Sequence, residues 1–65
     1  MNIVSVKDYK AGDNVALQVT GLDMEYYGEV KEVSEDELKV DVDFFDTTLT
    51  FTLKDGQKVT TFCKD

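Results

Sequence analysis

The sequence contains no histidine, arginine, tryptophan or proline, and only one cysteine, Cys63. Without histidine the chain lacks the commonest general base and the commonest zinc ligand. Without arginine it lacks the planar side chain that binds a carboxylate or phosphate through two parallel hydrogen bonds. A single thiol cannot form a disulfide within the chain and suits a reducing compartment, so we expect a cytoplasmic protein.

Long hydrophobic runs are also missing, because no apolar stretch exceeds three residues. Such runs are too short to cross a bilayer, and the N-terminus lacks the apolar segment of a secretory signal. The sequence therefore predicts no association with a membrane.

Acidic residues dominate the charge of the chain, which has 65 residues, a net charge of -7 and a pI near 4.3. A negative surface repels phosphate backbones, so we expect no direct contact with nucleic acid. A basic protein or peptide is the natural partner for such a surface. The same acidity would also keep a small chain in solution without any partner, and both interpretations stay open.

Turn-forming residues recur at short intervals and separate segments in which apolar and polar residues alternate. The turn signals lie at residues 11–14, 21–23, 34–37, 46–47 and 54–57, and Gly56 is expected to supply the positive φ of a tight hairpin. Short alternating segments at this spacing predict an all-β domain that spans residues 1–65. Five or six strands curled into a small, strongly bent antiparallel barrel would cover the apolar face and protect the sheet edges.

The clearest strand is LKVDVDF, residues 38–44, where Leu38, Val40, Val42 and Phe44 point inward and alternate with charged residues. Alternation of this kind places one face of a strand in the core and the other in water. Between Val30 and Val33 the alternation slips by one residue, so we expect a β-bulge near residues 31–32 that returns Val33 to the core. The predicted core consists of Val15, Leu17, Val19, Gly28, Val30, Val33, Leu38, Val40, Val42, Leu49, Phe51, Leu53 and Val59.

Three stretches resemble the Tudor-type, SH3-like barrels. YKAGDNV (residues 9–15) places an aromatic residue and a Gly-Asp turn before a strand, and YYGEVKEV (residues 26–33) resembles the family's second strand. Residues 38–46 resemble its third strand, which ends in an aromatic-rich turn, and the whole resemblance covers residues 9–53. It implies an SH3-like or Tudor-like barrel. The family's aromatic cage, which surrounds a methylated cation with π faces, would fall at Val19, Tyr26, Val42 and Phe45.

Two aromatic side chains with acidic neighbours form the predicted binding site. Tyr26 and Phe45 could line a groove at the open end of the barrel, and Tyr27, on the opposite strand face from Tyr26, is a further exposed candidate. Nearby carboxylates would favour a basic ligand. The predicted site residues are Glu25, Tyr26, Tyr27, Asp41, Asp43, Phe45 and Asp46, and the predicted function is non-catalytic binding of a basic peptide or protein surface.

Two other functions fit the same residues. The acidic run between Glu32 and Asp46 could imitate a phosphate backbone, as in a small phage-encoded inhibitor that blocks a nucleic-acid-binding enzyme. Lys31 directly precedes this run and Lys39 interrupts it, which weakens a continuous negative field. Alternatively the chain could be a structural part of an assembly, with an edge such as residues 3–6 added to a partner's sheet. The sequence does not define the oligomeric state.

Catalysis, metal binding and cofactors are not expected. Asp41 and Asp43 project from one face of a straight strand, whereas calcium loops bend around the ion. Nothing in the pattern buries either carboxyl to raise its pKa for acid–base work. Cys63 has no histidine to activate it as a nucleophile.

Overall fold

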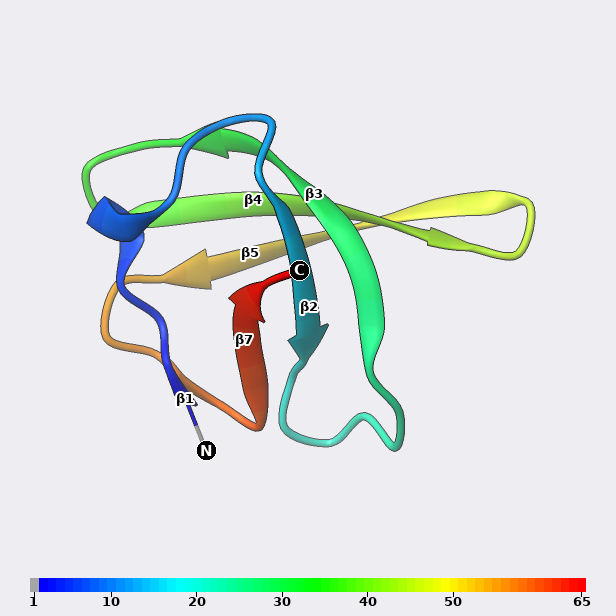
Figure 1. Ribbon diagram of the computed structural model, residues 1–65. Coiled ribbons are helices and arrows are strands. Elements are labelled where there is room, and N and C mark those ends of the chain that lie inside the picture. The colour runs from blue at the N-terminus through cyan, green and yellow to red at the C-terminus, as the bar shows by residue number, and fades with distance from the viewer. Residues whose placement is uncertain (1) are drawn as a thin grey trace.

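The computed structural model describes residues 2–65 and consists of strands, turns and one turn of 3-10 helix (Figure 1). The elements are β1 (Asn2–Ile3), η1 (Val6–Asp8), β2 (Asn14–Gln18), β3 (Tyr26–Val33), β4 (Glu37–Phe44), β5 (Thr47–Lys54), β6 (Lys58–Val59) and β7 (Thr61–Lys64). The larger sheet has the order β5-β4-β3-β2-β7, and β1 pairs with β6 in a smaller one. All pairings are antiparallel, which confirms the predicted all-β class.

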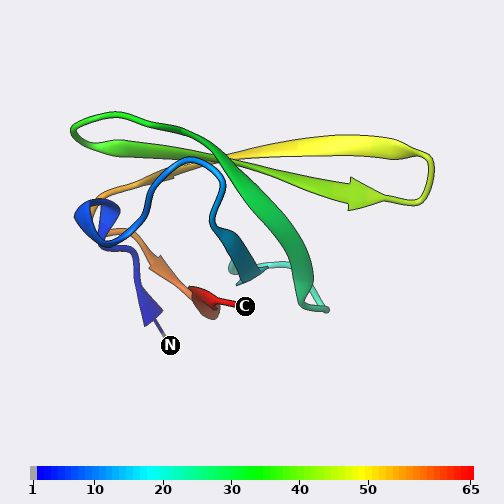
Figure 2. The same ribbon diagram turned by 45° about the horizontal axis from the view of Figure 1, so that its top comes forward.

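The larger sheet bends along β3. Residues 26–29 of this strand pair with β2, whereas residues 28–33 pair with β4. The sheet thereby divides into a half that contains β4 and β5 and a half that contains β2 and β7, which run in different directions (Figures 1 and 2). Within residues 2–65, β5 and β7 are the edges of the sheet and do not pair with each other. The bent sheet is therefore open and is not a closed barrel.

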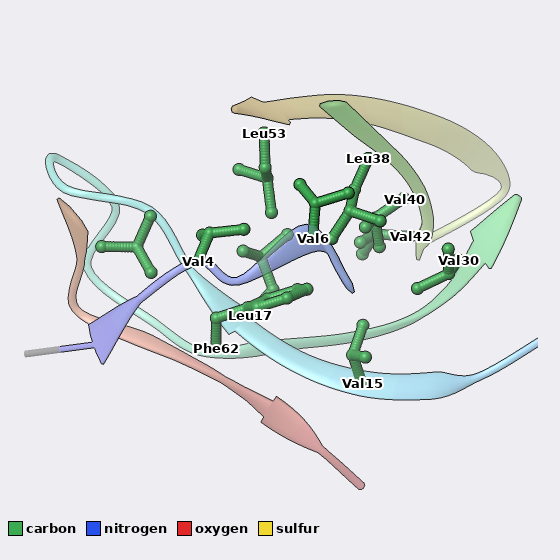
Figure 3. Packing of buried hydrophobic residues seen from close by; sticks show 11 residues of the cluster. Val4, Val6, Val15, Leu17, Val30, Leu38, Val40, Val42, Leu53 and Phe62 are labelled. Carbon is green, nitrogen blue, oxygen red and sulfur yellow. The ribbon is translucent and has the colours of Figure 1, made fainter. Parts of the chain in front are cut away.

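The hydrophobic core fills the space enclosed by the bend (Figure 3). It contains Val4, Val6, Val15, Leu17, Val30, Leu38, Val40, Val42, Leu53, Val59 and Phe62. Alternation predicted the members from β2 to β5 correctly, because a half-buried strand sends every second side chain inward. Burial of each large apolar side chain contributes about 1.5–3 kcal/mol, so this cluster is the main source of stability.

Four buried apolar residues were missing from the predicted core. Val4 and Val6 belong to the N-terminal segment, Ala16 lies on the opposite face of β2, and Phe62 lies in β7. The N-terminal segment is held by residues near the other end of the chain. The N–H of Val4 donates to the carbonyl of Gln57 (2.8 Å), and the carbonyl of Val4 accepts from the N–H of Gly56 (2.8 Å).

The β-bulge is present, because the register between β3 and β4 shifts between Val30 and Glu32. It places Val33 opposite Leu38, on the core side of the sheet. The prediction that Val33 is buried was nevertheless wrong, since its side chain is 39% exposed. Val33 is the last residue of β3, and its side chain lines an open hollow together with Ala11 and Ser34.

The turn at residues 55–56 has the backbone that its sequence predicted, with φ +84° at Gly56. It does not close a hairpin, however, because the short strand that follows, β6, pairs with β1. Residues 58–63, which the sequence pattern predicts as one sixth strand, are divided between β6 and β7, and β7 then pairs with β2. Residues 2–3 are consequently occupied within the fold by their pairing with residues 58–59.

Candidate binding surfaces on the β4–β5 hairpin and the outer face

The β4–β5 hairpin extends well beyond the rest of the sheet, and its two-residue turn of Phe45 and Asp46 is the far tip (Figures 1 and 2). Phe44 and Thr47 are the pair that closes this turn. Phe45 has φ +59° and is 91% exposed, the most exposed large apolar side chain of residues 2–65. Positive φ is a rare conformation for a bulky residue, because Cβ comes close to the backbone. Such strain is concentrated at functional sites.

Three aromatic rings form a row from β3 to the hairpin tip. The rings of Tyr26 and Phe44 are 5.8 Å apart, and Phe45 stands edge-on to Phe44 at 4.7 Å. We call Tyr26, Phe44 and Phe45 the aromatic row. The structure thus links the two predicted groove residues through Phe44, which the sequence had placed inside and which is half-buried.

The projection of the hairpin also explains why Leu49 is not in the core. Leu49 lies opposite Val42 on the inner face, yet it is 37% exposed. The half of the sheet with β2 and β7 does not reach under this part of β5 (Figure 2). The prediction of a buried Leu49 was therefore wrong, and its side chain adds apolar surface on the inner face of the hairpin.

The predicted site residues divide between two surfaces. Tyr26, Phe45 and Asp46 belong to the hairpin end, whereas Tyr27, Asp41 and Asp43 lie on the outer face of the sheet. The outer-face residues surround a shallow polar hollow of about 450 Å³. Its full lining is Asn14, Tyr27, Gly28, Glu29, Lys31, Asp41, Asp43, Thr48 and Asp65.

Glu25 directly precedes Tyr26 of the aromatic row in the sequence, but its side chain contacts Tyr27 on the outer face. The hydroxyl of Tyr27 donates to Oε1 of Glu25 (2.9 Å). This hydrogen bond, together with the negative charge of Glu25, raises the pKa of Tyr27 above its ordinary value. The phenol consequently stays protonated and acts as a hydrogen-bond donor throughout the physiological range.

Lysines neutralise part of the acidic surface but leave three carboxylates of the predicted site without an ion pair. Lys31 pairs with Glu29 (3.5 Å), Lys39 with Glu32 (3.2 Å) and Lys64 with Asp13 (3.8 Å). These are the ion pairs of residues 2–65, so Asp41, Asp43 and Asp46 have no cationic partner there. Asp41 accepts instead from Oγ1 of Thr50 (2.8 Å).

The geometry does not reproduce an aromatic cage for a methylated cation. Of the four cage positions in the family resemblance, Val42 is fully buried and cannot line a surface site. Val19 is packed against the core, which leaves only Tyr26 and Phe45 as possible walls. A desolvated cation needs several π faces around it.

Residues 2–65 contain no group of three or more metal-ligating side chains close enough to hold an ion. The thiol of Cys63 is exposed. No helix in this part of the chain is both long and apolar enough to cross a membrane.

No protein family model, curated protein or solved structure matches the chain.

Proposed function

We propose that this chain is a non-catalytic binding module that recognises a basic peptide or protein surface through the aromatic row and its acidic neighbours. The observation that carries the proposal is Phe45, whose aromatic ring is exposed at the tip of a hairpin in a strained backbone conformation. A glycine would satisfy this turn without strain. A phenylalanine at this exposed position is explained by contact between its ring and a partner.

The scaffold suits such a role. The order β5-β4-β3-β2-β7, bent over one core, supports an SH3-like or Tudor-like assignment in which the barrel is left open. β4 and β5 project past the core (Figure 2), and at the tip of this projection Phe45 is 91% exposed. A lone exposed thiol supports a reducing location such as the cytoplasm.

Charge favours a basic partner. The chain carries a net charge of -7, and the unpaired carboxylate of Asp46 lies directly beside Phe45 in the turn. A positive partner would be steered toward this end, and cationic side chains could also stack on the exposed rings. Aromatic burial would supply most of the affinity, because exposed ion pairs contribute little in water.

The proposal is tested by titrating isotope-labelled protein with a panel of lysine-rich and arginine-rich peptides and recording backbone amide NMR shifts. We expect shifts centred on the aromatic row. Tyr26→Ala and Phe45→Ala should each weaken binding about tenfold or more, whereas moderate salt should have a smaller effect. Tyr27→Ala is the matched control, since it removes an exposed aromatic from the outer face. Loss of binding with Tyr27→Ala but not with Phe45→Ala would reject the hairpin site.

A second candidate is an inhibitor that imitates nucleic-acid charge, and the arrangement of the outer face favours it. Glu29, Asp41, Asp43 and Asp65 all line the same hollow, with Lys31 as the only cation among the lining residues. Such an inhibitor would tolerate Phe45→Ala and fail with the double variant Asp41→Asn, Asp43→Asn. Its target would be released from immobilised protein by duplex DNA, which distinguishes it from a partner of the aromatic row.

A further inference from the structure

We infer that β5 is a self-pairing edge, through which two copies of this chain join antiparallel in a register centred on Thr50. This inference rests on the free backbone groups of β5 and is independent of the proposed function. β5 has eight residues, TTLTFTLK, and is an edge of the larger sheet. Charged residues, proline and bulges usually protect such an edge from pairing, but Lys54 is the only one of these devices in β5.

The hairpin geometry identifies which backbone groups of β5 are free. Across a two-residue turn, the closing residues Phe44 and Thr47 form a hydrogen-bonded pair, and such pairs alternate with non-bonded ones along the ladder. The N–H and C=O groups of odd-numbered residues in β5 therefore point toward β4. Those of even-numbered residues point outward, which here means away from β4 and toward the free edge of the sheet. Lys54 confirms this parity, because its N–H donates to Oε1 of Gln57 and its C=O accepts from the Gln57 N–H.

Lys54 is thus already capped by Gln57, and the outward groups of Thr48, Thr50 and Thr52 remain. No other strand among residues 2–65 pairs with this side of β5. In a two-fold dimer, Thr50 can exchange both hydrogen bonds with Thr50 of the second copy. The same register pairs Thr48 with Thr52 of the second copy and Thr52 with its Thr48, so every uncapped outward group of β5 is used.

The side chains also agree with this register. On the inner face, the half-exposed Leu49 lies opposite Phe51 of the second copy, and Phe51 lies opposite its Leu49, so both gain apolar cover. On the outer face, threonines meet threonines. Beyond them, Lys54 lies opposite Asp46 of the second copy, which brings opposite charges together at both ends. A shift by two residues in either direction loses this charge pairing and leaves outward groups unpaired or competing with Gln57.

Salt should strengthen the dimer. Each copy carries a net charge of -7, and this repulsion acts over the whole surface, whereas the paired strands are nearly neutral. Screening therefore reduces repulsion more than attraction. Binding of a basic ligand at the aromatic row should change with salt in the opposite sense, so failure of either proposal can be recognised separately.

The experiment uses the full chain with Cys63→Ser, which removes the exposed native thiol. Single cysteines are then placed at positions 48, 50 and 52 and oxidised. A hydrogen-bonded pair in an antiparallel ladder has Cα atoms about 5.5 Å apart, within the range for a disulfide. In the proposed register only Thr50→Cys faces itself. We expect disulfide-linked dimers from Thr50→Cys alone, and from a mixture of Thr48→Cys with Thr52→Cys.

Sedimentation of the protein without added cysteines, at micromolar to millimolar concentration, provides the second measurement. We expect a species of twice the 7.3 kDa chain mass, favoured by salt. Thr50→Pro removes one outward N–H per copy without breaking a bond to β4, and should weaken the dimer about tenfold or more. Thr50→Val keeps the N–H and is the matched control. A monomer at every concentration, or equal crosslinking from all three single cysteines, would overturn the inference.

Discussion

Gly28 of β3 lies so close to the carbonyl oxygen of Asp41 in β4 that a Cβ atom at residue 28 would overlap it. The same Cβ would lie 2.8 Å from Cγ2 of the fully buried Val42. Gly28→Ala should therefore force the two strands apart and destabilise the fold by about 1–3 kcal/mol, as overpacking of a core does. Urea unfolding followed by circular dichroism measures this change in the free energy of unfolding.

Gly12→Ala separates this steric effect from backbone strain. Gly12 has φ +98°, but a Cβ there would meet nothing within 4 Å. The expected loss is about 1 kcal/mol from the positive φ alone. If Gly28→Ala destabilises the fold no more than Gly12→Ala, the close approach of β3 and β4 does not limit this position.

Two substitutions of Phe45 should separate the strain of its backbone from the contribution of its ring to binding. Phe45→Ala and Phe45→Gly both remove the ring, but only glycine relieves the positive φ at the first residue of the turn. We expect Phe45→Gly to be more stable than Phe45→Ala by about 1 kcal/mol, a difference of about 4–8 °C in the unfolding temperature. Thermal unfolding measures the difference, and both variants should bind basic peptides equally weakly. Equal stabilities would show that the turn stores no strain.

Tyr27 should titrate above the ordinary tyrosine value of about 10 because Glu25 accepts its proton in a hydrogen bond. Glu25→Ala should return the pKa of Tyr27 toward that value. A raised pKa in the folded state means that the stabilising contribution is complete below about pH 10 and is lost as pH rises through the raised value. Absorbance of the tyrosinate at high pH, in a background of Tyr9→Phe and Tyr26→Phe, reports on Tyr27 alone. An unchanged titration in Glu25→Ala would contradict the assignment.

Asp55 should contribute to stability through its contact with the N-terminal segment. Its Oδ1 atom accepts from the backbone N–H of Val6 (3.0 Å), and Val6 is buried. Asp55→Ala should leave this donor unsatisfied and cost about 1–3 kcal/mol in urea unfolding. Asp55→Asn, whose amide oxygen can accept the same hydrogen bond, should retain most of the stability. The contact is unimportant if the two variants unfold alike.

Alternation predicted the faces of the central strands, because period two depends only on local backbone geometry. It identified Leu38, Val40 and Val42 as buried and placed Asp41 and Asp43 on the outer face. It also placed Tyr26 and Tyr27 on opposite faces. The predicted site nevertheless combined residues of both faces, because it grouped residues that are close along the chain. Neighbouring residues of a strand lie on opposite sides of the sheet.

Features that depend on how far an element extends could not be predicted in the same way. Leu49 follows the same alternation as Leu53, but it lies where the hairpin projects past the core, and only Leu53 is buried. Val4 and Val6 were missed for the converse reason. They lie in a segment without regular strand pairing and are buried through hydrogen bonds to residues 55–57. Phe44 is the last residue of β4, and its half-buried ring contacts Tyr26 and Phe45.

The N-terminal segment carries a consequence for the order of folding. Oδ1 of Asn2 accepts from the backbone N–H of Phe62, 60 residues later, and Val4 and Val6 are held by residues 55–57. Residues 2–6 therefore have no binding partner until residues 55–62 are also available. Because these contacts join distant parts of the sequence, we expect the domain to fold in one cooperative step only when both segments are present.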